Sequence, residues 1–220
     1  MNTDWGDGGH FNFMEYSWHG YLFGAEQSWN TRAETDSFNR RFNALFLGIR
    51  DRAFEKAFTT LGDISTLSLP PWYQSIWKHV FFGTPSDAWF HLQGPQEAVA
   101  ARLGKVLQTR LQFNAGYGDK CRQRLLAVRR EFKRVSRRSG ADPEGILPYW
   151  IFAVDTLLHA TRKLSILGPG GNNTPRNRRS LQREMAALLE QFDKLWHARN
   201  RHSEFRITRA AYRRAIRSLD

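Results

Sequence analysis

The feature that most constrains the fold is a helical spacing of apolar residues, which begins near residue 36 and continues to the C-terminus. The first predicted helix carries Phe38, Phe42, Leu45, Phe46 and Ile49 at positions i, i+4, i+7, i+8 and i+11. Residues at these spacings share one face of an α-helix. A second helical segment continues through Phe54, Phe58 and Leu61. The pattern predicts a mainly α fold.

After Pro85 the chain is predicted to be helical almost throughout. The predicted helices cover residues 86–90, 95–111, 120–138, 148–167, 181–196 and 208–219. Segments rich in glycine, asparagine or proline separate the later helices at residues 114–118, 140–143 and 168–175. Residues 148–167 form the most apolar stretch, so we expect them to be the central helix. Antiparallel helices joined by short turns give a helix bundle.

The first thirty residues follow a different pattern. They are rich in glycine and aromatic residues and lack helical periodicity. Residues 2–7 and 20–29 are predicted as strand ends or loops, and the glycines between them suit a backbone that turns tightly. Residues 67–77 contain Pro70 and Pro71 and are predicted as an irregular connector.

Composition excludes several classes of protein. The chain of 220 residues is 41% hydrophobic and has one cysteine, Cys121, so an internal disulfide and a cysteine-rich zinc site are excluded. No run approaches the eighteen apolar residues of a membrane-spanning helix, so we expect no membrane partner. The acidic start lacks the features of a secretory signal, which favours a cytoplasmic location.

Charge is unevenly distributed along the chain. The net charge is +12, but residues 1–30 hold four acids and no lysine or arginine, so the other 190 residues carry +16. Residues 120–138 have nine basic side chains against one acid, and residues 176–220 have twelve against five. Basic helices of this kind allow salt-dependent binding of nucleic acid, and they equally suit an arginine-rich face that contacts only solvent.

The densest group of residues that could bind a ligand lies in residues 2–10 and 24–30. It comprises Asp4, Trp5, Asp7, His10, Glu26 and Trp29. Indole rings stack on the apolar face of a pyranose, and carboxylates accept hydrogen bonds from sugar hydroxyls. The alternatives are an N-terminal turn with tryptophans in the core, and a divalent metal site formed by Asp4, Asp7, His10 and His19.

Two segments resemble the last barrel strands of family 20 glycoside hydrolases, the β-N-acetylhexosaminidases. Trp5-Gly-Asp7 is similar to the aromatic-x-Asp that ends the penultimate strand, and Gly24-Ala-Glu-Gln-Ser-Trp29 to a segment of the last strand. The resemblance implies that Trp29 forms a wall of the N-acetyl sugar pocket and that Asp7 accepts hydrogen bonds from sugar hydroxyls. Trp5 stands where the family often has a tyrosine that bonds the acetamide. His10 and Glu26 are further candidates for substrate binding, with a structural role the alternative for Glu26.

The resemblance also has departures that bear on activity. Many family members have a glutamate two residues after the pocket tryptophan, where this chain has Thr31. The family's catalytic pair is an adjacent Asp-Glu, and this chain contains no Asp-Glu dipeptide. We therefore expect a C-terminal part of such an enzyme that carries sugar-binding residues but no catalytic residue, metal or cofactor, and that does not hydrolyse glycosides alone.

The expected organisation follows from the same resemblance. Residues 1–60 would be the end of a (β/α)₈ barrel, a short β/α remnant, and residues 61–220 a helical domain. The expected partners are a glycan containing N-acetylhexosamine and either the missing barrel or a second copy of the chain. A basic helical module that binds nucleic acid or docks on a protein is the alternative.

Overall fold

The computed structural model describes residues 11–65, 77–83, 115–138, 140–168, 170–203 and 205–220. These residues form helices and connecting loops, and no strand occurs among them. The elements are α1 (Met14–Trp29), α2 (Thr35–Leu45), α3 (Arg52–Ser65), a π-helical turn η1 (Trp77–Phe81), α7 (Ala115–Val135), α8 (Leu147–Leu167), α9 (Pro175–Arg199) and α10 (Phe205–Arg217). The expectation of a mainly α protein is confirmed.

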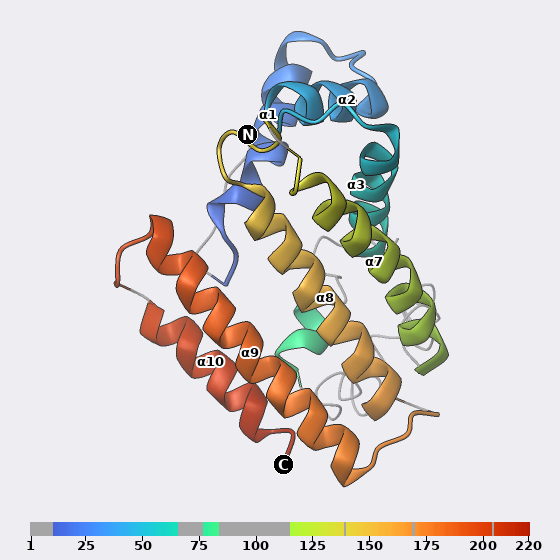
Figure 1. Ribbon diagram of the computed structural model, residues 1–220, viewed down its shortest axis with the longest axis vertical. Helices are drawn as coiled ribbons and strands as arrows, with labels where there is room; N and C mark the ends of the chain where they lie inside the picture. The colour runs from blue at the N-terminus through green and yellow to red at the C-terminus, as the bar shows by residue number, and fades with distance from the viewer. Residues whose placement is uncertain (1–10, 66–76, 84–114, 139, 169, 204) are drawn as a thin grey trace, which may run out of the picture.

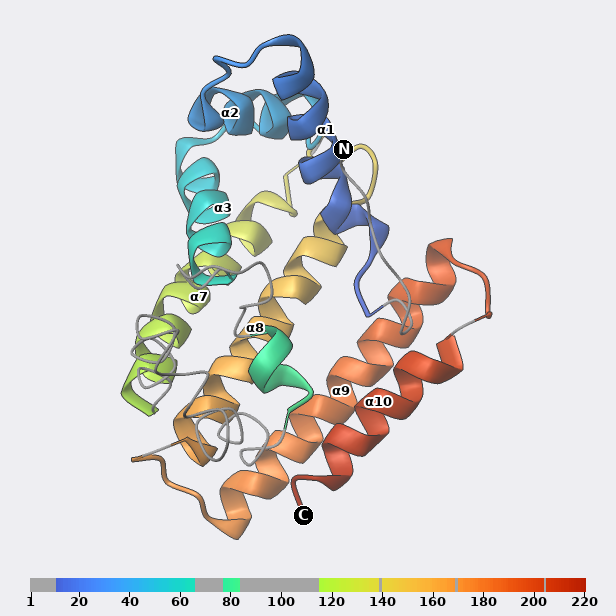
Figure 2. The ribbon, with the colours of Figure 1, turned by 180° about the vertical axis from the view of Figure 1, so that it is seen from behind.

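Helix α8 is the centre of the fold (Figure 1). Helix α7 packs on one side of it and α9 on the other, while α3 lies against α7 and α10 against α9 (Figures 1 and 2). Helices α1 and α2 lie together at one end, and α1 contacts the start of the bundle through α8. The segment 148–167 is thus the central helix that its apolar sequence predicted.

Helix α8 begins at a turn that the sequence specifies. Gly140 and Asp142 have positive φ values of 77° and 58°, so the chain turns sharply between the end of α7 at Val135 and the start of α8. The Asp142 carboxylate accepts hydrogen bonds from the backbone N–H groups of Ile146 at 2.6 Å and Leu147 at 2.8 Å. It thereby satisfies donors that the first turn of α8 leaves unpaired.

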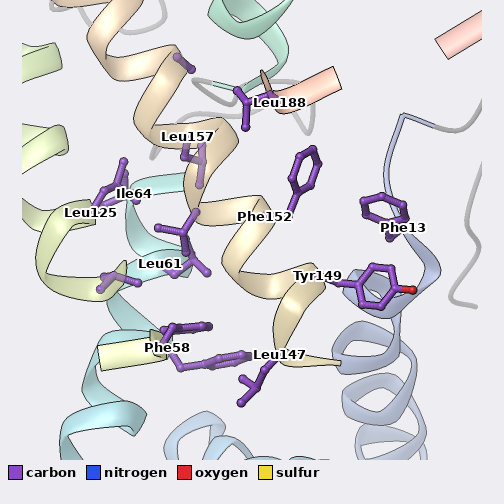
Figure 3. Close-up of a cluster of buried hydrophobic side chains, with 14 of the residues drawn as sticks. Phe13, Phe58, Leu61, Ile64, Leu125, Leu147, Tyr149, Phe152, Leu157 and Leu188 are labelled. Carbon is purple, nitrogen blue, oxygen red and sulfur yellow. The ribbon is translucent and has the colours of Figure 1, made fainter. Parts of the chain in front are cut away.

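Aromatic rings fill the core beside α8. Phe13, which precedes α1, has its ring centroid 4.7 Å from that of Phe192 on α9 and 4.9 Å from that of Tyr149 on α8. Figure 3 shows Phe13, Tyr149 and Phe152 gathered on one side of α8, with Leu61 and Leu125 on the other. The core therefore continues across α8 and joins the N-terminal helices to the C-terminal ones.

The apolar positions predicted for the later helices are buried. Helix α7 buries Leu125, Val128, Phe132 and Val135, and α9 buries Leu181, Met185, Leu188, Phe192 and Trp196. Phe54 and Phe58 of α3 lie against Phe132, with ring centroids 4.7 and 6.4 Å from it. One hydrophobic cluster spans both sides of residue 60, and the proposed division there stays a prediction.

The π-helical turn η1 is fastened to α8 by one buried lysine. Lys163 is almost fully buried, and its ammonium donates hydrogen bonds to the backbone carbonyl oxygens of Phe81, at 3.1 Å, and Gly83. A charged donor on a carbonyl gives a stronger hydrogen bond than a neutral one. This contact holds the end of η1 against the central helix.

Three local expectations were wrong. Residues 20–29 are helical rather than strand or loop, so the segment 24–29 that resembles the last barrel strand is not a strand. Helix α1 packs Tyr16 and Phe23 against the core from one side, and elongation of a helix costs little once it has begun. Residues 115–118 form the first turn of α7 instead of a loop. Leu45 is 76% exposed although its spacing predicts the inner face. The predicted connector before Trp77 and the predicted helices at 86–90 and 95–111 lie outside the described residues.

Candidate functional site

The predicted sugar-site residues divide into two groups. Trp5, Asp7 and His10, together with Asp4, lie outside the described residues. Glu26 and Trp29 lie in the last two turns of α1. The Glu26 carboxylate accepts a hydrogen bond from Arg41 of α2 at 2.7 Å, and the Trp29 side chain is 92% exposed. The structure therefore gives Glu26 a partner within the protein and leaves the Trp29 ring open to solvent.

The inner side of α1 is held by specific contacts. The Tyr16 hydroxyl donates to the carbonyl oxygen of Tyr149 on α8 at 2.9 Å, and burial raises the pKa of Tyr16. The ring of His19 is hydrogen bonded to the Asn39 side chain at 2.8 Å and lies among phenylalanine rings of α2 and α3. The buried carboxylate of Glu15 lies 3.5 Å from the Arg199 guanidinium. These contacts fix the orientation of the helix.

The opposite side of α1 is apolar and exposed. Its residues Met14, Trp18, Leu22 and Trp29 are 46%, 40%, 38% and 92% exposed. At about 100° per residue these four positions fall within roughly 80° on the helix surface. We call them the α1 outer face. Contiguous exposed apolar residues on a soluble protein are typical of an interface with another structure.

The basic side chains of α7 are partly neutralised by acids. Asp155 of α8 accepts a 2.5 Å hydrogen bond from Arg129, and Asp51 accepts bonds from Arg134 at 2.9 Å and Arg138 at 2.8 Å. Arg134 also contacts Glu131, at 2.7 Å. Arg129 and Arg134 of α7, with Arg138 just after it, thus form ion pairs that join this segment to α8 and to the start of α3.

Helix α10 carries the least compensated positive charge. It contains five arginines and no acid, and no ion pair to any of the five occurs within the described residues. These residues, the α10 basic face, are Arg206, Arg209, Arg213, Arg214 and Arg217. With His202 and Phe205 they line a shallow groove of about 540 Å³. The opposite side of α10 buries Thr208, Tyr212 and Ala215.

A metal centre finds no support among the described residues. No group of three or more histidine, cysteine or acidic side chains able to hold a metal ion occurs there, and His19 is engaged by Asn39. Within the same part of the chain, no helix combines the length and the apolar character that a bilayer crossing requires. Cys121 is buried, and burial raises the pKa of its thiol, which disfavours a reactive thiolate.

Comparison with known proteins adds no relative to this description. No protein-family model matches the chain, and neither the curated proteins nor the solved structures contain a match.

Sequence reasoning missed the α1 outer face because it finds no helical periodicity in the first thirty residues and predicts strand ends or loops over residues 20–29. The signal was present: Met14, Trp18 and Leu22 recur at intervals of four residues, which is a helical spacing. The glycines of this segment obscured it, since glycine disfavours the interior of a helix.

Proposed function

We propose that this chain is the C-terminal part of a glycoside hydrolase of the β-N-acetylhexosaminidase type, whose catalytic Asp-Glu pair lies on polypeptide outside these 220 residues. The α1 outer face is the observation that carries the proposal. A helix of a (β/α)₈ barrel packs an apolar stripe against the strands. An exposed stripe on a helix whose other side is firmly docked fits a helix that has lost such a partner.

The order of the segments supports the same arrangement. Residues 1–10 contain Trp5-Gly-Asp7, which resembles the end of a barrel strand, and α1 follows directly. The β/α remnant would then consist of that segment as strand and α1 as helix. Trp29 stands at the C-terminal end of α1, which in such a barrel lies at the face opposite the active site, so in this arrangement its exposed ring would not contact the sugar.

In this proposal the remaining helices support the barrel and take no part in the chemistry. Sugar contacts would come from Trp5, Asp7 and His10, whereas Glu26 serves the fold through Arg41. Hydrolysis in this class is assisted by the substrate's own acetamide, with an acid supplied by the enzyme. The 220-residue chain alone would bind the glycan at most weakly and would not cleave it.

The test begins with the reading frame upstream of Met1, which should encode barrel strands and an Asp-Glu pair. The extended protein should release p-nitrophenol from p-nitrophenyl N-acetyl-β-D-glucosaminide, and the 220-residue chain should not. In the extended protein Asp7→Ala should lower kcat/KM by at least about tenfold, a loss of about 1.4 kcal/mol. The matched control Asp63→Ala, on α3, should leave kcat/KM unchanged. An upstream frame without barrel strands contradicts the proposal.

The α10 basic face favours a second candidate function, the binding of a polyanion such as nucleic acid. Arg206, Arg209, Arg213 and Arg217 follow one another at intervals of three or four residues, so they form a stripe about 16 Å long. Phosphates of a nucleic acid strand can contact such a stripe in succession. Binding of this kind releases counterions and weakens steeply with salt.

A salt titration with a fluorescent DNA duplex tests this candidate. The triple variant Arg206→Gln, Arg209→Gln, Arg213→Gln should reduce the slope of log K against log salt by about 2.7, or about 0.9 for each phosphate that the variant no longer neutralises. A control triple variant at the end of α7 and just after it removes equal charge: Arg130→Gln, Lys133→Gln, Arg137→Gln. Equal effects of the two variants would contradict a site on α10, as would absence of binding at low salt.

A further inference from the structure

A cleft between α7, α8 and α9 combines charged and apolar side chains. It has a volume of about 360 Å³, within the range of small-molecule sites. Its polar lining comprises Arg122, Arg129, Asp155, His159, Arg162, Glu184 and Gln191. Its apolar lining comprises Leu126, Leu158, Ala187 and Leu188. All of these lining residues belong to α7, α8 or α9, and we call the site the α7–α8–α9 cleft.

His159 is the buried polar group of this cleft. Its side chain is 3% exposed, and neither ring nitrogen has a hydrogen-bond partner within the described residues. Glu184 Oε2 lies 3.5 Å from Nδ1, at the outer limit of such a bond, and the Phe81 ring packs edge-on behind the imidazole. Burial, with the charges of Lys163 and Arg162, lowers the pKa of His159 to about 3. The ring is therefore neutral near pH 7 and presents one donor and one acceptor.

The charges that line the cleft leave one arginine uncompensated. Arg129 is paired with Asp155, and Arg162 with Glu184. Arg122 has no ion pair within the described part of the chain, and it lines the same cleft as Arg162, whose pKa is lowered by burial and then by the Arg122 charge. A bound anion would relieve this repulsion. The net charge of the lining is one positive unit.

The apolar lining indicates what accompanies the anionic group. Leu158 and Leu188 form the inner part, Leu188 being buried, while Leu126 and Ala187 are exposed. A ring or short hydrocarbon chain that covers these side chains would bury apolar surface, and burial of apolar surface stabilises a complex. The matching ligand therefore has one charged end and an apolar body.

We propose that the α7–α8–α9 cleft binds a small organic carboxylate with an apolar body, held by the Arg122 guanidinium and by the imidazole of His159. A guanidinium binds a carboxylate through two parallel hydrogen bonds. The His159 N–H donates to the same carboxylate or to a polar group beside it. A single negative charge matches the lining better than a doubly charged phosphate ester does. The site is independent of the barrel proposed above, because all its walls lie within this chain.

The experiment is calorimetric titration of the 220-residue protein with 2-naphthoate at low salt. We expect saturable binding with one site per chain. Arg122→Gln should weaken it by about tenfold or more, as expected for the loss of a charge-assisted hydrogen bond. The matched control Arg130→Gln removes an exposed arginine of the same helix outside the cleft and should leave the affinity unchanged. Equal weakening by both variants, or no binding to the wild-type protein, overturns the proposal.

Two further measurements separate a specific site from general attraction. Ala187→Trp places an indole at the exposed rim and should abolish binding while the circular dichroism spectrum stays that of the wild type. In the wild-type protein the NMR signals of the His159 ring should shift on titration. 2-Naphthyl phosphate should bind more weakly than 2-naphthoate, and 2-naphthalenemethanol should not bind. Tighter binding of the phosphate overturns the assignment to carboxylates, and equal binding of the alcohol overturns the role of Arg122.

Discussion

Helices α8 and α1 are both rich in apolar residues, yet they relate differently to their surroundings. Helix α8 buries residues around most of its circumference, because α7, α9 and η1 all pack against it. Helix α1 is docked on one side and carries Met14, Trp18, Leu22 and Trp29 exposed on the other. A helix that is apolar on all sides is normally enclosed by protein. We conclude that α8 has its full set of neighbours in this chain, whereas among the described residues α1 lacks one.

The largest expected effect concerns the enclosed helix. Phe152→Ala on α8 should lower the free energy of unfolding by about 3–5 kcal/mol, because it removes a buried ring and leaves a cavity. Leu22→Ala on the outer face of α1 should change it by less than about 0.5 kcal/mol. Urea denaturation followed by circular dichroism gives both values. Similar losses for the two variants would show that α1 is as enclosed as α8.

The second largest effect concerns Asp51, whose ion pairs join the start of α3 to α7. The Phe54 backbone N–H, with Arg134 and Arg138, lowers the pKa of Asp51 from its usual 3.8 to about 2. Because the folded pKa is depressed, this stabilisation is complete above about pH 4 and is lost as the pH falls through about 2. Allowing for the solvent exposure of both arginines, it contributes about 1–2 kcal/mol.

Asp51→Asn separates the contribution of the ion pairs from that of the hydrogen bond by which the Asp51 side chain caps the start of α3. The asparagine side-chain oxygen still accepts the bond from Phe54, so the variant should lose only the ion pairs and show a flatter stability profile between about pH 5 and 2. Asp51→Ala should lose about 1 kcal/mol more, because the cap is removed too. Denaturation at a series of pH values measures both. Parallel profiles for the wild type and Asp51→Asn would contradict the assignment.

A smaller effect is expected at the contact between α1 and α8. Tyr16→Phe removes the hydroxyl that donates to the Tyr149 carbonyl oxygen and should lower the free energy of unfolding by about 1 kcal/mol. Tyr21→Phe, on the same helix, is the control and should be neutral. Hydrogen exchange should quicken first in α1, since its attachment is weakened. Uniform quickening across α8 as well would show that the two helices open as one unit.

The smallest effect on stability is expected at the α1 outer face, where substitutions should mainly change the binding of apolar molecules to the surface. Trp18→Ser combined with Leu22→Ser should change the free energy of unfolding by less than about 1 kcal/mol, since both side chains are partly exposed. Binding of the dye ANS should fall markedly, because the dye reports exposed apolar surface. Unchanged dye binding would show that the face is already covered.

The sequence predicted the C-terminal helices well because their apolar residues are few, regularly spaced and bounded by clear breaks. Leu125, Val128 and Phe132 are buried as their spacing requires, although α7 ends at Val135, three residues before the predicted end. Residues 20–29 were mispredicted because Gly20 and Gly24 disfavour a helix interior and because aromatic residues lie on both sides of α1, which together hide the helical period. Leu45 is exposed because α2 ends there and the chain turns away.

The residues of the proposed sites were less predictable than the fold. Exposure of Trp29 depends on the absence of a neighbour, which no local pattern reports. The cleft depends on side chains from three helices, and only the spacing of Asp155, His159 and Arg162 along α8 indicates a polar stripe in advance. Whether the His159 ring has a hydrogen-bond partner depends on residues far away in sequence, such as Glu184 and Phe81.

The buried ammonium of Lys163 has a practical consequence for following the protein in solution. An acylating reagent reaches only amines that contact solvent, so this lysine should be modified last, and only after η1 separates from α8. Lys56, Lys120, Lys133 and Lys194 would be labelled early, which gives an internal reference. The rate at which Lys163 becomes labelled, measured by mass spectrometry, would therefore report how fast η1 separates from α8.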